Sequence, residues 1–300
     1  MTGGGALLAG YVADLVAGDP RRWHPVAGFG ATAATIERSA YAPSRVRGAL
    51  VTGALVAGAA GVVELLARRT SRAAVLVAVT WAALGGRSLR REAGAVGDFI
   101  EREELDLARS RLRSLCGRDA TGLDASDLSR AVVESLAENT SDAVVGALLW
   151  GAIAGPGGVA AYRAANTLDA MFGHRNARYA QFGWAAARLD DAMSWPAARA
   201  CAALACLAAP LVGGSLLETV RTIRRDGGAH PSPNAGQVEA AFAGALGLRL
   251  GGPLAYAGAA EVRPTLGAGR TPTPADARRA ARLSLAVSTA AALLTAAVRR

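Results

Sequence analysis

The stretch that decides the fold is residues 48–67, GALVTGALVAGAAGVVELLA. About twenty predominantly apolar residues are enough for a helix to cross the hydrocarbon core of a bilayer. Glu64 is the one charged residue in this stretch, and it lies near the end. Arg68, Arg69 and Arg72 follow it and mark a membrane interface. The stretch therefore predicts a membrane-spanning helix.

Working outward, the chain offers further apolar runs with polar segments between them. The candidate spans are residues 48–67, 73–86, 143–165, 196–213 and 283–298. The first run, residues 3–17, is short and is interrupted by Asp14. We predict an all-α, polytopic integral membrane bundle with 4–5 spans and polar helical loops, forming one domain over residues 1–300.

The run at residues 143–165 is broken by Gly155-Pro156-Gly157-Gly158, which leaves two topologies open. A single crossing would place the polar segments on its two sides in opposite compartments. A re-entrant hairpin at the break would place both at the same face. Periodicity does not choose between them.

Composition narrows the classes of function. The net charge is +9, every one of the 33 basic residues is arginine, and these are scattered through the connecting segments. This distribution argues against nucleic-acid binding and fits basic loops beside anionic membrane lipid. The absence of lysine excludes a Walker A loop and a pyridoxal Schiff base. Cys116, Cys201 and Cys206 lack metal-ligand spacing and are expected to be reduced.

Two polar clusters lie in the first half of the chain. Residues 18–25 include Asp19 and His24, and predict either a turn at the interface or part of a site. Glu134, Glu138 and Asp142 recur every four residues and would form one carboxylate stripe on a helix. That stripe is either a solvated face or a site for arginine or a divalent cation such as Mg²⁺.

Two more clusters follow. The third contains Arg163, Asn166 and Asp169 at a spacing of three, and continues to Asp190-Asp191. It predicts either an anion- or metal-binding site or ordinary salt bridges between helices. The fourth is His230-Pro-Ser-Pro-Asn-Ala-Gly236, in which Ser232 or Asn234 is a plausible N-cap. It is either a simple capped turn or a helix start that receives an anion.

Together these clusters resemble the CobD/CbiB family of cobalamin biosynthesis proteins, the adenosylcobinamide-phosphate synthases. The resemblance extends from about Asp14 to about Gly267, and one visible departure is the lack of a proline at the start of the apolar run from residue 143. The matching stretches are residues 14–25, Gly117-Arg118-Asp119, Glu134 with Glu138-Asn139 and Asp142, Tyr162-Arg163 with Asn166 to Asp169, Arg175-Asn176 with Tyr179, Phe182-Gly183, Ala187 to Asp191, Pro196-Ala197 with Arg199, and Ser232 to Gly236.

The resemblance implies a multi-pass enzyme of the bacterial inner membrane. Such an enzyme joins adenosylcobyric acid to an amino-alcohol phosphate, typically aminopropanol phosphate, in an ATP-dependent amide ligation expected to need Mg²⁺. Its partners would be these substrates and membrane lipid, without nucleic acid. A homo-oligomer or a complex with other cobalamin-pathway membrane proteins stays open.

Site residues follow from the matched positions. The catalytic candidates are Glu134, Glu138, Asp142, Asp190 and Asp191, with Glu138, Asp142 and Asp190 as metal candidates. The substrate-binding candidates are Asp19, His24, Arg118, Asp119, Asn139, Arg163, Asn166, Asp169, Arg175, Asn176, Arg188, Ser232 and Asn234. We expect Glu138, Arg163, Asp190 and Asn234 to converge in one pocket at the lipid–water boundary.

Three rival classes remain. A membrane transporter would use Glu64, Glu134 and Asp142 as intramembrane acids, but most acids here lie at span ends or in loops. A membrane phosphatidyltransferase would show an Asp-Gly-x-x-Ala-Arg pattern, and this sequence lacks it. A scaffold would leave the four polar clusters unexplained.

Overall fold

The computed structural model describes residues 1–20, 23–117, 120–174, 176–256 and 259–299, with the side chains of residues 253–262 left out. The chain divides into two compact units, which interleave along the sequence. Unit 1 comprises residues 1–85, 142–197 and 291–300, and unit 2 comprises residues 86–141 and 198–290. Each unit is described by itself.

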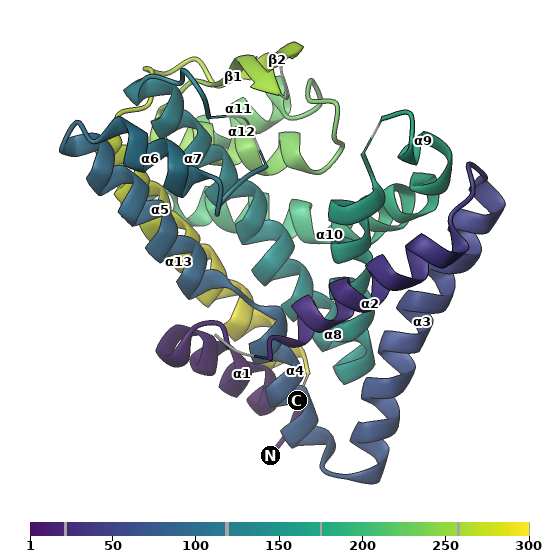
Figure 1. Ribbon diagram of the computed structural model, residues 1–300. Coiled ribbons are helices and arrows are strands. Elements are labelled where there is room, and N and C mark those ends of the chain that lie inside the picture. Colours follow the sequence, from purple (N-terminus) through teal and green to yellow (C-terminus); the bar gives the residue numbers. More distant parts are fainter. Residues whose placement is uncertain (21–22, 118–119, 175, 257–258, 300) are drawn as a thin grey trace. The chain divides into compact units, whose positions relative to one another are not determined.

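Unit 1 is built from helices, and its first four helices each start at a capping side chain. Its elements are α1 (Gly3–Ala17), α2 (Pro25–Ala40), α3 (Arg45–Arg69), α4 (Arg72–Ala83), most of η1 (Thr140–Val145), α8 (Gly146–Phe172), α9 (Tyr179–Phe182), the first half of α10 (Trp184–Ala208) and the end of α13 (Pro274–Val298). Ser44 caps α3 and Ser71 caps α4. Figure 1 shows α3 and α4 joined by a short turn and α2 packed across α3 and α8.

Helix α3 exposes an apolar surface, whose contact with water would be unfavourable. Leu50, Val62, Leu65 and Leu66 are all more than half exposed. A continuous exposed apolar face on a 25-residue helix fits contact with lipid. Helix α4 has only 12 residues, so the run at residues 73–86 is shorter than a full span requires.

Helix α8 is two antiparallel arms, because the chain reverses at Gly155. Gly155 has φ 70° and ψ −149°, which an L-residue adopts only with strain. A Cβ on Gly146 would lie 2.2 Å from the Tyr162 hydroxyl oxygen, and one on Gly158 would lie 2.4 Å from the Trp150 carbonyl oxygen. Residues 16 apart in a straight helix would be separated by about 24 Å. The hairpin topology at residues 155–158 is therefore the one the chain adopts.

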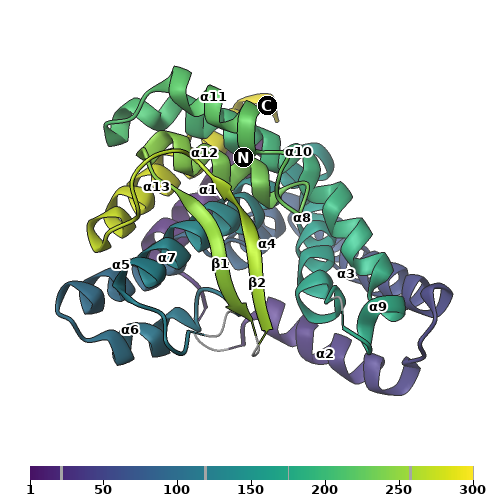
Figure 2. The same ribbon diagram turned by 90° about the horizontal axis from the view of Figure 1, so that it is seen from above.

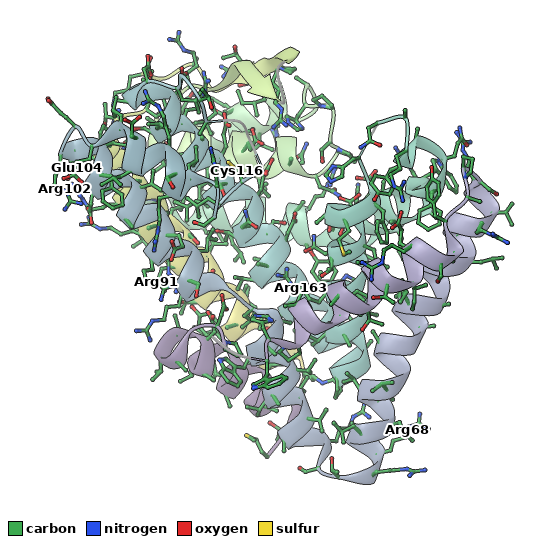
Figure 3. All side chains as sticks on the ribbon, viewed as in Figure 1. Arg68, Arg91, Arg102, Glu104, Cys116 and Arg163 are labelled. Atoms are coloured by element: carbon green, nitrogen blue, oxygen red, sulfur yellow. The ribbon has the colours of Figure 1, made fainter. Side chains whose placement is uncertain are left out.

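Two basic side chains approach this reversal. The Arg299 guanidinium donates to the Ala152 carbonyl, at the end of the first arm, and Arg72 and Arg299 both approach Gly155. Arg72 also pairs with Glu64. Arg68 lies at the same end of α3, far from Arg163 (Figure 3). The hairpin tip thus lies beside basic side chains. Asp142 and Asn166 lie at the opposite end of the hairpin from this tip.

Unit 2 contains the polar segments and a small sheet. Its elements are α5 (Gly86–Glu101), α6 (Leu105–Leu112), α7 (Ala125–Asn139), the second half of α10, η2 (Ala209–Val212), α11 (Leu216–Asp226), α12 (Ala235–Leu246), β1 (Leu250–Tyr256), β2 (Ala259–Leu266) and most of α13. The strands pair antiparallel as a two-stranded ribbon (Figure 2). Sequence patterns did not predict this hairpin, which lies in the Gly- and Pro-rich connection.

The polar segment from residue 87 onward forms α5 and α6, which agrees with the predicted polar helical loops. Helix α5 buries Leu89, Ala93, Val96 and Ile100 on one face. Its exposed residues are charged, and Glu92 pairs with Arg111 of α6 at 2.5 Å. The arm is therefore amphipathic, with its apolar face packed on α6 and α7.

By length and composition, four helical stretches of the described chain could cross a membrane: Arg45–Arg69, Ala125–Phe172, Trp184–Val212 and Pro274–Val298. Gly3–Ala17 is shorter. The prediction of an all-α polytopic membrane protein is confirmed, with the β1–β2 ribbon as a small addition. Four of the five candidate spans lie within these stretches. The single-domain assignment over residues 1–300 stays a prediction.

Candidate functional site

A buried polar network lies in unit 1, and we name it the Arg163 cluster. It consists of Asp142, Tyr162, Arg163, Asn166, Asp190 and Ser194. The second arm of α8 supplies three of these side chains and α10 supplies two. Their presence on facing helices follows from the reversal at Gly155, which brings Asp142 back beside the second arm.

Hydrogen bonds connect the members of the Arg163 cluster in a chain. Arg163 Nη1 donates to Asn166 Oδ1 at 3.0 Å, and Asn166 Nδ2 donates to Asp190 Oδ1 at 3.3 Å. The Ser194 hydroxyl donates to the same Asp190 oxygen at 3.4 Å and lies 3.2 Å from the Tyr162 hydroxyl. Asp190 is only 9% exposed. The network therefore fixes a buried acid and a guanidinium on adjacent helices.

Arg163 is the cationic centre of this cluster. The carboxylates of Asp142, Asp19 and Asp190 all act on it electrostatically. Its Nε is buried and has no hydrogen-bond partner among the described residues. A guanidinium with a spare donor in a shielded place is suited to receive an anion such as a phosphate or carboxylate.

An apolar cavity of about 440 Å³ adjoins Arg163. Helices α2, α3, α4 and α8 line it with side chains such as Phe29, Leu55 and Val63, and Arg163 is the one charged residue of the lining. The cavity could receive the apolar part of a ligand whose acid group meets the guanidinium.

The remaining predicted residues of unit 1 lie around this network. Asp191 pairs with Arg188 at 3.2 Å. Asp169 interacts electrostatically with Asp191 and His174. His24 caps α2 through Nδ1, which accepts from the Val26 N–H at 3.2 Å. These groups have ordinary structural partners, as the salt-bridge and interfacial-turn interpretations allowed.

A second buried network lies in unit 2, and we name it the Glu239 cluster. It consists of Glu134 and Glu138 of α7, Glu239 of α12, and His230 in the loop before α12. Glu138 hydrogen-bonds and acts electrostatically on Glu239, and Glu134 acts on it electrostatically. Burial raises the pKa of Glu239 well above its usual range, and the two neighbouring carboxylates raise it further.

Two atoms at the centre of the Glu239 cluster lack partners among the described residues. Glu239 Oε1 and His230 Nε2 are both buried, lie 3.9 Å apart and have no hydrogen bond. His230 Nδ1 accepts from the Ser232 N–H at 3.0 Å, so the neutral ring carries its proton on Nε2. Burial lowers the pKa of His230, and Arg263 lowers it further.

Glu134 differs from Glu138 and Glu239 because its carboxylate already accepts a backbone hydrogen bond. Its Oε1 accepts from the Gly251 N–H at 2.8 Å and lies 3.8 Å from Arg130. Gly251 has φ +75°, and a Cβ there would lie 2.1 Å from the Pro264 carbonyl oxygen. Glu134 therefore holds the start of β1 on α7, and Glu138, which is partly exposed, is the most accessible acid of the Glu239 cluster.

Of the two predicted N-cap residues, Asn234 occupies the N-cap position of α12, but its side chain makes no capping hydrogen bond. The Ser232 hydroxyl accepts from the Asn234 and Ala235 N–H groups at 3.3 and 3.2 Å. Arg199 Nη1 donates to Asn234 Oδ1 at 2.7 Å. A guanidinium therefore lies at the start of α12, where a helix N-terminus favours negative charge.

Other predicted residues have local roles or lie outside the described residues. Asn139 donates to the Ser135 carbonyl at 2.9 Å, and Asn176 Oδ1 accepts from the Tyr179 N–H at 2.9 Å in the turn before α9. Arg118, Asp119 and Arg175 lie outside the described residues.

The four residues expected to converge belong to different units. Arg163 and Asp190 are in unit 1, whereas Glu138 and Asn234 are in unit 2. The metal site at Glu138, Asp142 and Asp190 likewise stays a prediction. In the described ranges no group of three or more His, Cys, Asp or Glu side chains could hold a metal ion.

Sequence reasoning missed four members of these networks as site residues: Tyr162, Ser194, His230 and Glu239. Glu239 had a usable signal, because it is the one charged residue in the otherwise apolar helix α12. Ser194 had none, since a serine in an apolar helix is common.

The fold and the two networks define a class, a polytopic helical membrane protein with buried acid–base clusters. The chain matches the family model described as CobD/Cbib protein over residues 7–284. It therefore belongs to the CobD/CbiB family, and is a cobalamin biosynthesis protein of the CobD type.

Relatives are similar in sequence to nearly the whole chain. A Mycobacterium tuberculosis protein named "Cobalamin biosynthesis protein CobD" is 52% identical over 292 residues, covering 96% of this chain and 93% of the relative. Proteins of the same name from Chromobacterium violaceum and Geobacter metallireducens are each 42% identical, covering 95% and 92% of this chain and 95% and 90% of the relatives. No solved structure matches the chain significantly.

Proposed function

We propose that this protein is an adenosylcobinamide-phosphate synthase of the bacterial inner membrane, which joins adenosylcobyric acid to aminopropanol phosphate or a related amino-alcohol phosphate. Family membership supports the pathway. The observation that carries the reaction type is the Arg163 cluster, where a guanidinium with a spare donor and a buried acid are linked through Asn166.

Amide formation requires two things of a protein. The substrate carboxylate must be activated, for which ATP with Mg²⁺ would supply a phosphoryl group. The amine nitrogen then bonds to the acyl carbon, phosphate leaves with the acyl oxygen, and a base takes the proton that the nitrogen releases. A cation must offset the negative charge on the acyl oxygen and the leaving phosphate.

The residues of the chain can be matched to these tasks. Arg163, with Arg118, Arg175 and Arg188, would hold the phosphate groups or the corrinoid carboxylate. Asp190 and Asp142 are the candidate bases, with Asp191, Glu134 and Glu138 in the wider set. Ser232 and Asn234 would present the start of α12 to a phosphate.

Magnesium fits less well than the anions do. Carboxylate oxygens are the ligands that Mg²⁺ prefers, but the described carboxylates form no ready-made cage. Mg²⁺ usually keeps several waters and binds through substrate phosphates. We therefore assign it to the nucleotide and derive no step from it.

The test is a reconstituted reaction. The purified full chain, in detergent or nanodiscs, is incubated with adenosylcobyric acid, ATP, Mg²⁺ and aminopropanol phosphate, and the corrinoid product is read by mass. Parallel reactions omit ATP or replace the amine with ethanolamine phosphate. The expected product carries the added amino-alcohol phosphate and forms only with ATP. Absence of that product from folded protein would overturn the proposal.

The transporter alternative predicts a different result. In liposomes it would give uptake of a corrinoid or an ion without any change in mass. Asp142 and Asp190 belong to a hydrogen-bonded or electrostatic network with Arg163, which favours a fixed site over a moving carrier acid.

A further inference from the structure

We propose that the Glu239 cluster and the start of α12 form the binding site for the small phosphorylated amine. The amine would contact Glu239 and Glu138, and the phosphate would contact the first turn of α12 beside Arg199. This inference rests on the proposed function, because it assigns one substrate of that reaction to residues of unit 2.

The cluster is incomplete by itself. Glu239 Oε1 and His230 Nε2 are buried and face each other at 3.9 Å, too far for a hydrogen bond. Buried polar atoms are normally paired, and each unpaired atom carries a desolvation cost. A ligand that satisfies both atoms must offer a donor to the carboxyl oxygen and an acceptor to the ring N–H.

A phosphorylated amino alcohol offers both groups. Its ammonium or amine is a donor, and its ester oxygen, two carbons away, is an acceptor. The positive charge also offsets the repulsion among three glutamates that converge from α7 and α12. A simple anion would supply the acceptor but no donor, and an apolar molecule would supply neither.

Access and occupancy agree with this assignment. Glu134 is already held by the Gly251 N–H, so it is not the acid that receives a ligand. Glu138 is partly exposed and hydrogen-bonds to Glu239, which gives the pair an approach from the surface of unit 2.

The anionic end has its own set of groups in the same loop. The Ser232 hydroxyl orders the turn before α12 by accepting from the Ala235 N–H, and Arg199 donates to Asn234 Oδ1 at 2.7 Å. A helix N-terminus favours a phosphate through its amides and its dipole. Asn234 and Glu239 are five positions apart, or about 7.5 Å along the helix axis. An amino-alcohol phosphate can bridge this distance with a hydrogen bond of about 2.8 Å at each end.

The binding test uses the full chain in detergent and three probes, measured by calorimetry. These are aminopropanol phosphate, propyl phosphate without the amine, and aminopropanol without the phosphate. We expect aminopropanol phosphate to bind at least tenfold more tightly than either partial compound. Equal affinity for propyl phosphate would mean that the two unpaired atoms hold only water, and would overturn the inference without any variant.

Variants then assign the two ends. Glu239→Gln should lower the affinity for aminopropanol phosphate at least tenfold and leave that for propyl phosphate unchanged. Asn234→Ala should weaken both. Glu218→Gln on neighbouring α11 is the matched control, because its side chain is exposed and pairs with Arg221. Should Glu239→Gln fail to fold, Glu138→Gln makes the same test.

Kinetics separate the inference from the proposed function. In the reconstituted reaction, Glu239→Gln should raise KM for aminopropanol phosphate and leave KM for adenosylcobyric acid unchanged. Wild-type turnover with no change in the amine KM would refute the site and keep the reaction. Tight, amine-dependent binding without any product would refute the reaction and keep the site.

Discussion

Gly146 lies directly against the ring of Tyr162, although the two residues are 16 positions apart in one apolar segment. A Cβ at residue 146 would be 2.2 Å from the Tyr162 hydroxyl oxygen. This contact is possible only because the chain reverses at Gly155. It also places the Tyr162 hydroxyl within 3.2 Å of Ser194, inside the Arg163 cluster.

Replacement of Gly146 by alanine should therefore disturb the Arg163 cluster from a distance. The added methyl group must displace the Tyr162 ring, at a cost of roughly 1–3 kcal/mol in stability. Synthase activity should fall with it. Thermal unfolding in detergent measures the first effect, and product formation measures the second. Gly53→Ala is the matched control, since a Cβ there meets nothing within 4 Å. Equal tolerance of both substitutions would contradict the hairpin contact.

The reversal also predicts which residues share a membrane face. In a background without Cys116, Cys201 and Cys206, we expect Ala154→Cys at the hairpin tip and Thr70→Cys at the end of α3 to react with an impermeant maleimide from the same side. Ala170→Cys, about 24 Å further along the second arm, should react from the opposite side. A single crossing through residues 143–165 would instead bury Ala154→Cys in the bilayer and protect it.

The sequence predicted the apolar helices but not their path. The composition of residues 48–67 alone predicts a membrane-spanning helix, because a long uninterrupted apolar run has one simple interpretation. Residues 143–165 do not, because a glycine-proline break permits a crossing or a reversal with the same hydropathy. The deciding fact is the fit of Gly146 against Tyr162, which is a tertiary contact.

The site was predictable to a similar extent. Arg163, Asn166 and Asp190 were found by spacing and resemblance, and the structure links them by hydrogen bonds. Glu239 was overlooked because a single acid in an alanine-rich helix is ambiguous until its neighbours are known. Its partners Glu138 and His230 come from segments about 100 and 9 residues away, and no local pattern connects them.

Asp190→Asn should abolish most of the synthase activity while the protein remains folded. The amide keeps the shape of the side chain but cannot accept a proton, and loss of a general base typically costs 10²- to 10⁴-fold in rate. Ser194→Ala, which removes one hydrogen bond to Asp190, should have a smaller effect of about tenfold or less. Asp106→Asn, at an exposed side chain on α6, is the control. Wild-type turnover of Asp190→Asn would remove Asp190 from the site.

Gly251→Ala should release the start of β1 from α7. The substitution strains a backbone with φ +75°, collides with the Pro264 carbonyl and weakens the hydrogen bond to Glu134. Gly247→Ala shares the left-handed backbone, with φ +66°, but a Cβ there meets nothing within 4 Å. We expect Gly247→Ala to cost about 1–2 kcal/mol for backbone strain and Gly251→Ala to cost clearly more. Similar unfolding temperatures for the two variants would show that Glu134 is not held in this way.

Glu239→Gln should impair substrate binding and yet stabilise the protein at high pH. Burial raises the pKa of Glu239 above its ordinary value of 4.5, so the folded state favours the protonated form. A raised pKa contributes stability that is complete below the ordinary value and is lost as pH rises through the folded pKa. Glutamine cannot ionise and avoids this loss. The unfolding temperature of Glu239→Gln relative to wild type should therefore be higher at pH 8 than at pH 4.5, whereas Glu218→Gln should show no such trend. The other titrating groups are common to both proteins, so the difference reports the ionisation of Glu239 together with its electrostatic coupling to Glu138 and Glu134. A constant difference across this range would show that the carboxyl ionises as readily in the folded chain as in the unfolded one.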